Sequence, residues 1–223
     1  MSQTWHDLLF AHWNIDSRML RDLVPAQLEL DTFEGRCWVG VVPFRMSAIH
    51  ARWLPPIPGA SAFPELNVRT YVKLDQKPGV YFFSLDAADR LAVWAARRFY
   101  RLPYFHAAMK CTPKREEILY DSRRYRGNAE FRARYRAMGP VRVRDRGTLE
   151  HWLTERYCLY ATAGERAFRG EIHHQPWPLQ DAEAEIEANT MTAASGIDLP
   201  RQSPLLHFAA RLEVLIWPLQ PAS

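Results

Sequence analysis

The chain has 223 residues, of which 48% are hydrophobic and 24% are charged. This length fits one large β-rich domain as well as two small ones, and the composition is that of a folded protein with a sizeable core. The formal net charge of +4 permits an anionic partner without requiring one. The 16 prolines argue against a helical bundle.

The three cysteines, Cys37, Cys111 and Cys158, are widely spaced and form no C-x-x-C motif. A disulfide framework or a zinc ribbon is therefore not expected, and the pattern favours a reducing, cytoplasmic compartment. The N-terminal residues 1–18 lack a basic segment followed by a long apolar run. We expect neither a signal peptide nor a transmembrane span.

Hydrophobic patterns and turn residues predict a succession of short strands with two or three helices. Helices are expected over 16–25, where Asp16 is the N-cap and Pro25 the end, over 89–102 and over 148–155. Strands are expected over 8–14, 63–74, 80–87, 156–162, 168–174, 182–190 and 205–217. Two further strands are expected within 28–46 around a Glu34-Gly35 turn, and a hairpin over 117–136. A proline-rich loop is expected over 54–64 and a turn over 76–79.

Around ten short strands with few helices indicate an antiparallel barrel or sandwich. No internal repeat, low-complexity tract or linker interrupts the pattern, so we predict a single domain over residues 1–223.

The strand FPELNVRTYVKL over 63–74 has one apolar and one polar face, because side chains alternate between the faces of a strand. Its polar face carries Glu65, Asn67, Arg69 and Tyr71. If that face points to bulk water, the segment is an ordinary amphipathic strand. If it points inward, a carboxylate, an amide, a guanidinium and a phenol line a binding site. The mixture of groups, and the proline-rich loop before it, favour a cleft.

The chain carries no motif for a metal, a nucleotide or a nucleophile. His173 and His174 are adjacent and so face opposite ways on a strand, and H-E-x-x-H, G-x-S-x-G and glycine-rich phosphate loops are absent. We expect no metal and no cofactor. His12 is a candidate site residue because it lies on a predicted strand between Phe10 and Trp13.

An arginine-rich segment over 123–146 is interleaved with aromatic residues. A basic ribbon of this kind can contact phosphates while aromatic rings stack on bases. The aromatic residues alternate out of phase with most of the arginines, which favours a solvated outer face instead. The acidic residues Glu183, Glu185 and Glu187 would form one face of another strand and offset this positive charge.

Several stretches together resemble the YqjF-like bacterial family, which is catalogued as a domain of unknown function. The stretches are LLFAHWNID, LRDLVPAQLELD, WVGVVPFRM, FPELNVRTYV, GVYFFSLDA, LPYFHA, LTERYCLY, IHHQPWPLQ and LEVLIWPL, and they cover nearly the whole chain.

The order of elements is also similar, more distantly, to the acetoacetate decarboxylase-like superfamily. Glu65 matches that superfamily's pocket glutamate, and residues 91–105 match a helix and its end. The resemblance implies an α+β, β-rich fold, with a closed antiparallel β-barrel, a few flanking helices and an enclosed pocket. The resemblance also implies that the strand face carrying Glu65 points inward.

The chain departs from the superfamily at its reactive groups. The Schiff-base lysine belongs to a P-K-K-like stretch that here reads Pro103-Tyr104-Phe105. A phenol cannot form an imine with a ketone, so acetoacetate decarboxylase chemistry is not expected. The superfamily's pocket arginine falls near Asn14, and whether Lys110 reaches the pocket is left open.

These observations lead to a first hypothesis of a pocket for a small, anionic organic acid. Arg69 would hold a carboxylate or another oxyanion. Glu65 would move a proton, and Tyr104 would donate a hydrogen bond to an oxyanion or enolate. The further candidate ligand-binding residues are Asn67, His12 and Asn14.

The enzymatic version of this hypothesis is a lyase or isomerase that needs neither metal nor cofactor. The alternatives are a non-catalytic ligand-binding or sensing barrel and nucleic-acid binding through residues 123–146. Nucleic acid is the least favoured partner, no membrane association is expected, and assembly into a homo-oligomer stays open.

Overall fold

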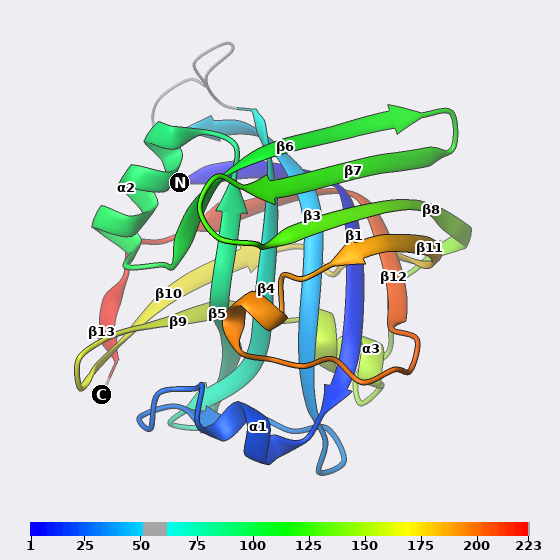
Figure 1. The fold of residues 1–223 in the computed structure, drawn as a ribbon. Coiled ribbons are helices and arrows are strands. Elements are labelled where there is room, and N and C mark those ends of the chain that lie inside the picture. The colour runs from blue at the N-terminus through cyan, green and yellow to red at the C-terminus, as the bar shows by residue number, and fades with distance from the viewer. Residues whose placement is uncertain (51–61, 223) are drawn as a thin grey trace.

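β-Strands dominate the structure, a computed structural model that describes residues 1–50 and 62–222 (Figure 1). The helices are α1 (Ser17–Arg21), α2 (Arg90–Tyr100) and α3 (Leu149–Thr154), with a 3-10 turn at Ala193–Ser195. The strands are β1 (Ser2–Ile15), β2 (Glu29–Leu30), β3 (Cys37–His50), β4 (Phe63–Leu74), β5 (Lys77–Ala87), β6 (Tyr104–Lys114), β7 (Glu117–Arg124), β8 (Glu130–Arg142), β9 (Cys158–Ala163), β10 (Arg166–His174), β11 (Leu179–Asn189), β12 (Leu205–Ile216) and β13 (Gln220–Ala222).

The strands form one sheet that closes on itself. Its order is β13-β10-β9-β5-β6-β7-β8-β11-β12-β1-β3-β4-β2, and the additional pairings β10–β12 and β5–β4 close it into rings. Most pairings are antiparallel, but β5 pairs in parallel with both β6 and β9. The predicted closed, β-rich barrel is therefore confirmed, and the sheet is mixed where only antiparallel pairing was expected.

The helices begin where side chains cap them. Asp16 and Asp89 accept hydrogen bonds from the backbone N–H groups of Arg18 and Ala92, at 2.9 and 2.6 Å, and so satisfy donors that the first helical turn leaves free. In Figure 1, α1 lies at the lower end of the barrel and α2 at the upper left, beside the start of β6. Within the described ranges, no helix is long and apolar enough to cross a membrane.

Strands β1, β3 and β4 form a wall with a separate hydrophobic cluster on each side. On β4, Leu66 and Val68 belong to one cluster, together with Phe131 of β8. Tyr71 belongs to the other cluster, together with Phe10 of β1. Strand alternation thus places the apolar and polar faces of β4 in two different interiors, and neither face points to bulk water.

The elements follow the sequence predictions closely, with some shifts. The hairpin of β7 and β8 turns at the predicted position, whereas the β4–β5 turn lies one residue early, at Asp75 and Gln76, which both have positive φ. Strand β6 had no predicted counterpart. Residues 54–61 of the predicted proline-rich loop lie outside the described residues, and Phe63 and Pro64 already belong to β4.

Candidate functional site

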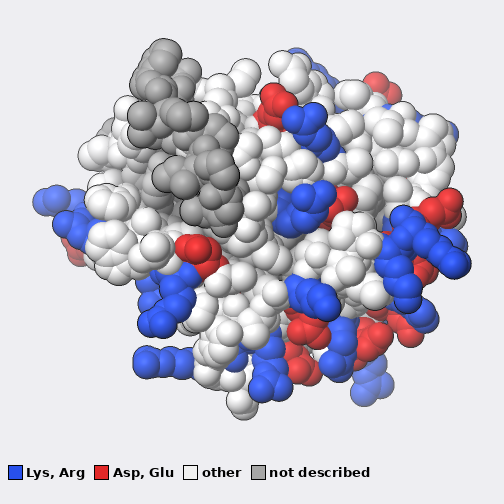
Figure 2. Space-filling model, turned by 90° about the horizontal axis from the view of Figure 1, so that it is seen from above, with Lys and Arg blue, Asp and Glu red and all other residues white. Residues whose placement is uncertain are grey.

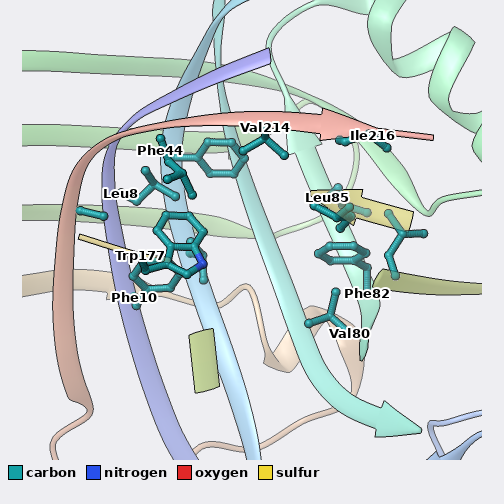
Figure 3. Close-up of a cluster of buried hydrophobic side chains, with 14 of the residues drawn as sticks. Leu8, Phe10, Phe44, Val80, Phe82, Leu85, Trp177, Val214 and Ile216 are labelled. Carbon is teal, nitrogen blue, oxygen red and sulfur yellow. The ribbon is translucent and has the colours of Figure 1, made fainter. Parts of the chain in front are cut away.

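A cavity of about 270 Å³ lies inside the barrel, between the β1–β3–β4 wall, β5, α2, β9, β10 and β12. Its walls are mostly apolar. Figure 3 shows Phe10 of β1, Phe44 of β3, Phe82 and Leu85 of β5, and Trp177 gathered in one hydrophobic cluster. Binding pockets for small molecules are typically apolar hollows of this kind with a few polar groups.

The polar face of β4 supplies three of those polar groups. Glu65, Asn67 and Arg69 line the cavity. Their residues are 4%, 5% and 9% exposed, so all three are buried. The pleat of the strand explains why they share one side, because every second residue points the same way. The polar face therefore points into a cavity, as the resemblance to the decarboxylase-like superfamily implied.

Glu65 and Tyr104 form a hydrogen-bonded pair at the α2 side of the cavity. The Tyr104 hydroxyl donates to Oε2 of Glu65 at 2.7 Å. Burial raises the pKa of Glu65 to about 7; the Tyr104 hydrogen bond opposes this shift and the nearby Asp86 carboxylate adds to it. Burial also raises the pKa of Tyr104 well above its usual range, so the phenol stays protonated. A carboxyl group with a pKa near neutrality is suited to proton transfer.

Asp86 owes its position to a buried arginine. Arg124 of β7 approaches Asp86 with Nη2 at 2.8 Å and Nε at 2.9 Å, and both residues are buried. The guanidinium also lies 3.9 Å from the centre of the Phe105 ring. The ion pair holds the Asp86 carboxylate near Glu65, where its negative charge contributes to the raised pKa of Glu65.

Arg69 is a buried cation without a carboxylate partner. None of the ion pairs within residues 1–50 and 62–222 involves Arg69, and its Nε has no hydrogen-bond partner. The guanidinium lies 5.4 Å from the ring centre of Phe10 and 5.9 Å from that of Tyr71. The Oδ1 atom of Asn67 is buried and unpaired as well. Buried polar groups are normally paired, so an unpaired guanidinium nitrogen and an unpaired amide oxygen in the same cavity wall are unusual.

A second arginine, Arg156, lines the same end of the cavity, directly after α3. Its Nη1 contacts Oδ2 of Asp31 at 2.6 Å and its Nε donates to the Trp152 carbonyl at 2.7 Å. The guanidinium stacks over the ring of Trp152 at 4.3 Å. Burial lowers the pKa of Arg156, and Asp31 opposes that shift. Arg156 therefore has its own counter-ion, whereas Arg69 has none.

His12 and Asn14 do not line the cavity, although both were expected there. His12 lies beneath it, where its Nε2 is 2.7 Å from the Tyr71 hydroxyl, and that hydroxyl donates to the Leu153 carbonyl. Burial lowers the pKa of His12 well below its usual range, and the charge of Arg69 adds to this. A neutral imidazole must then donate through Nε2. His12 thus supports Tyr71, and Asn14 is only partly buried, two residues further along β1.

The cavity wall contains no lysine among the described residues. Tyr104 occupies the start of β6 and faces Glu65. Lys110 lies further along β6 with an exposed side chain, which answers the question of whether it reaches the pocket. Nor does the described part of the chain bring three or more His, Cys, Asp or Glu side chains together around a metal position.

The arginine-rich hairpin forms an ion-pair ladder with β11. Pairing of β8 with β11 sets Arg134 and Arg136 directly opposite Glu185 and Glu183, and sets Arg132 opposite Ala188, next to Glu187. The resulting ion pairs are Arg132–Glu187, Arg134–Glu185, Arg136–Glu183 and, beyond them, Arg144–Asp181. Figure 2 shows basic and acidic side chains interspersed on the lower part of the visible face. The positive charge of the hairpin is therefore largely neutralised within the chain.

Sequence reasoning missed the residues at the α3 end of the cavity. Arg156, Thr154 and Trp177 line it, and Asp31 holds Arg156 in place. Asp31 is far from the other three in the sequence, and the four residues share no spacing motif. The one available signal was Arg156 itself, a charged residue placed directly before an apolar strand.

The closed mixed barrel with an internal polar strand defines an acetoacetate decarboxylase-like fold. Acetoacetate decarboxylase from Legionella pneumophila superposes with a TM-score of 0.71 at 10% identity, covering 100% of this chain and 87% of that one. The enduracididine biosynthesis enzyme MppR, solved with pyruvate, superposes with a TM-score of 0.71 at 9% identity, covering 100% of this chain and 90% of MppR. An acetoacetate decarboxylase-like enzyme from Sphingomonas wittichii RW1 superposes with a TM-score of 0.68 at 13% identity, covering 100% of this chain and 92% of that enzyme. At these identities the likeness concerns the fold.

Within that fold the chain belongs to the DUF2071 family, described as an uncharacterised conserved protein, whose model matches residues 2–213. It is 52% identical over 221 residues to the protein YqjF of Bacillus subtilis (strain 168), itself described as uncharacterised. That alignment covers 99% of this chain and 91% of YqjF. The resemblance drawn from the sequence is thereby confirmed.

Proposed function

We propose that this protein binds a small organic acid in the barrel cavity and catalyses proton transfer on it. The observation that carries the proposal is Arg69, a buried guanidinium that lines the cavity and has no carboxylate partner in the described chain. A guanidinium suits the geometry of a carboxylate or another oxyanion and binds it with charge-assisted hydrogen bonds. The structure of MppR with pyruvate supports the idea that this fold accepts such an acid.

Glu65 is the proposed acid–base group. In its ionised form it would remove a proton from the carbon next to a carbonyl group, and the electron pair of the broken C–H bond would move to the carbonyl oxygen as an enolate. Returning the proton to the same or a neighbouring atom completes an isomerisation, and loss of a leaving group from the enolate completes an elimination. A pKa of about 7 leaves both forms of Glu65 populated at neutral pH.

Tyr104 would stabilise the enolate. Its hydroxyl donates to Glu65 in the free protein and remains protonated because burial raises its pKa. Once Glu65 has accepted a proton it is neutral and competes less strongly for that hydrogen. The hydrogen then becomes available to the enolate oxygen, where negative charge develops.

The test is exchange of the C3 hydrogens of 2-oxobutanoate in D₂O, followed by ¹H NMR, together with calorimetric dissociation constants. We expect exchange that rises with pH through about 7, as Glu65 ionises. Glu65→Gln should slow it at least about a hundredfold while leaving affinity nearly unchanged. Arg69→Gln should weaken binding about a hundredfold, because it removes a charge-assisted hydrogen bond.

Arg134→Gln, at an exposed arginine of β8, is the matched control and should change neither quantity. Exchange that survives in Glu65→Gln would rule out the proton-transfer role. Unchanged affinity in Arg69→Gln would rule out the anion site.

A second candidate function is ligand binding without turnover. It is favoured by the phenol of Tyr104 at the position where the superfamily has its lysine, and by a cavity wall without lysine in the described residues. In that case 2-oxobutanoate binds through Arg69, but no exchange exceeds the rate in buffer.

A further inference from the structure

Strand β4 faces the cavity with polar side chains, and most of the other lining residues are apolar. Glu65 and Arg69 are four residues apart on one strand, so their Cα atoms lie about 13 Å apart at the usual rise per residue. Between them only Asn67 contributes a polar side chain from this strand. The apolar lining residues near this stretch include Phe10 of β1, Phe82 of β5, which pairs with Arg69, and Trp177.

Helix α2 closes the other end with small side chains. Ala92, Ala95, Ala96 and Phe99 all line the cavity. Their spacing of three and four residues puts them on one side of the helix. Because alanine fills little space, this side of the helix leaves room for part of a ligand instead of filling the barrel.

The size of the cavity exceeds what a three-carbon acid fills. An engineered apolar cavity of about 150 Å³ accommodates benzene, with six heavy atoms, so about 270 Å³ accommodates about eleven. Pyruvate has six heavy atoms and would leave the apolar wall beside α2 in contact with water. An acid with a hydrophobic body would bury that wall instead.

We infer that the ligand of this site is an amphiphilic acid with about eleven heavy atoms, such as a medium-chain or aromatic 2-oxo acid. This inference rests on the proposed function. The carboxylate lies at Arg69, and the apolar body lies along the cluster of Phe10, Phe82 and Trp177 and reaches the alanine face of α2.

The experiment is a chain-length series of straight-chain 2-oxo acids, from pyruvate to 2-oxodecanoate, with dissociation constants measured by calorimetry on the full-length protein. Affinity should rise about fourfold for each added methylene group that becomes buried. The rise should stop near 2-oxooctanoate, which has eleven heavy atoms. Octan-2-one, which lacks the carboxylate, should bind far more weakly than 2-oxooctanoate.

Two variants locate the apolar body. Ala95→Phe fills the cavity beside α2 and should weaken binding of 2-oxooctanoate at least about tenfold. The dissociation constant of pyruvate should change by less than about twofold. Ala108→Phe makes the same change at an exposed position of β6 and should leave both constants unaltered.

The outcomes separate this inference from the proposed function. A flat series, in which pyruvate binds as tightly as 2-oxooctanoate and both depend on Arg69, overturns the amphiphilic ligand and keeps the anion site. Equal binding of octan-2-one and 2-oxooctanoate, unaffected by Arg69→Gln, overturns the anion site and keeps the apolar pocket. No binding anywhere in the series overturns both.

Discussion

The arginines of β8 and the arginines of the cavity have opposite surroundings. On β8, Arg132, Arg134 and Arg136 have side chains that are about half exposed, and each has an acidic partner on β11. In the cavity, Arg69 is 9% exposed and has no acidic partner in the described chain. Exposed charges can rely on water, whereas a buried charge is costly unless something pairs with it.

The difference separates the arginines that have an acidic partner in the described chain from Arg69, which has none there. The β8 residues drew attention in the sequence because they are numerous and close together, yet β11 already neutralises them. Arg69 stands alone on an alternating strand and is less conspicuous. Arg156 lies between the two cases, since it is buried like Arg69 and paired like the β8 residues.

The largest expected effect is that of Arg156→Met on stability. Removing the arginine leaves Asp31 without the ion pair at 2.6 Å, and losing one member of a buried pair costs about 4 kcal/mol of unfolding free energy. Urea unfolding measures this change. The double variant Asp31→Leu/Arg156→Met should recover much of the loss, and failure to recover would show that the arginine acts by packing on Trp152 instead.

The next effect is the pH dependence that Glu65 imposes on stability. Its folded-state pKa of about 7 lies above the usual glutamate pKa of 4.5, so the folded state resists ionisation of this group. The carboxyl therefore lowers stability progressively as pH rises from about 4.5 to about 7, by about 3 kcal/mol in total. The unfolding free energy of wild type should fall by this amount relative to Glu65→Gln over that window. Parallel curves for the two proteins would mean that Glu65 titrates normally.

The smallest effect is expected at the exposed ladder. Arg134→Gln removes one ion pair with Glu185, but exposed pairs are screened by solvent and contribute little. Its unfolding midpoint and ligand affinity should equal those of wild type within error. If wild type bound single-stranded DNA with a strong, salt-dependent affinity that this variant lost, the result would support the alternative hypothesis of nucleic-acid binding.

The sequence predicts much of the local structure because strands, caps and turns depend on nearby residues. The alternation of 63–74, the hairpin near Gly127 and the N-cap Asp16 all appear where they were expected. The direction of the polar face did not follow from alternation alone. It depends on how the sheet closes, through the pairings β10–β12 and β5–β4 between distant segments.

The sequence could not predict how far along the barrel axis each side chain lies. His12 lies on the same side of the β1–β3–β4 wall as Phe10, yet it sits below the cavity and supports Tyr71. Asp31 and Arg156 meet although 125 residues separate them. Alternation gives the face of a side chain, but its position along that face depends on the tilt and register of every strand in the barrel.

The central claim is that Arg69 is a buried cation without an acidic partner among the described residues. The most direct measurement is the unfolding free energy of Arg69→Met without ligand, compared with wild type. Replacing a buried charge that has no acidic partner by an apolar side chain of similar length should stabilise the free protein by about 2 kcal/mol. Destabilisation as large as that of Arg156→Met would show that the chain itself compensates Arg69, and would contradict the account.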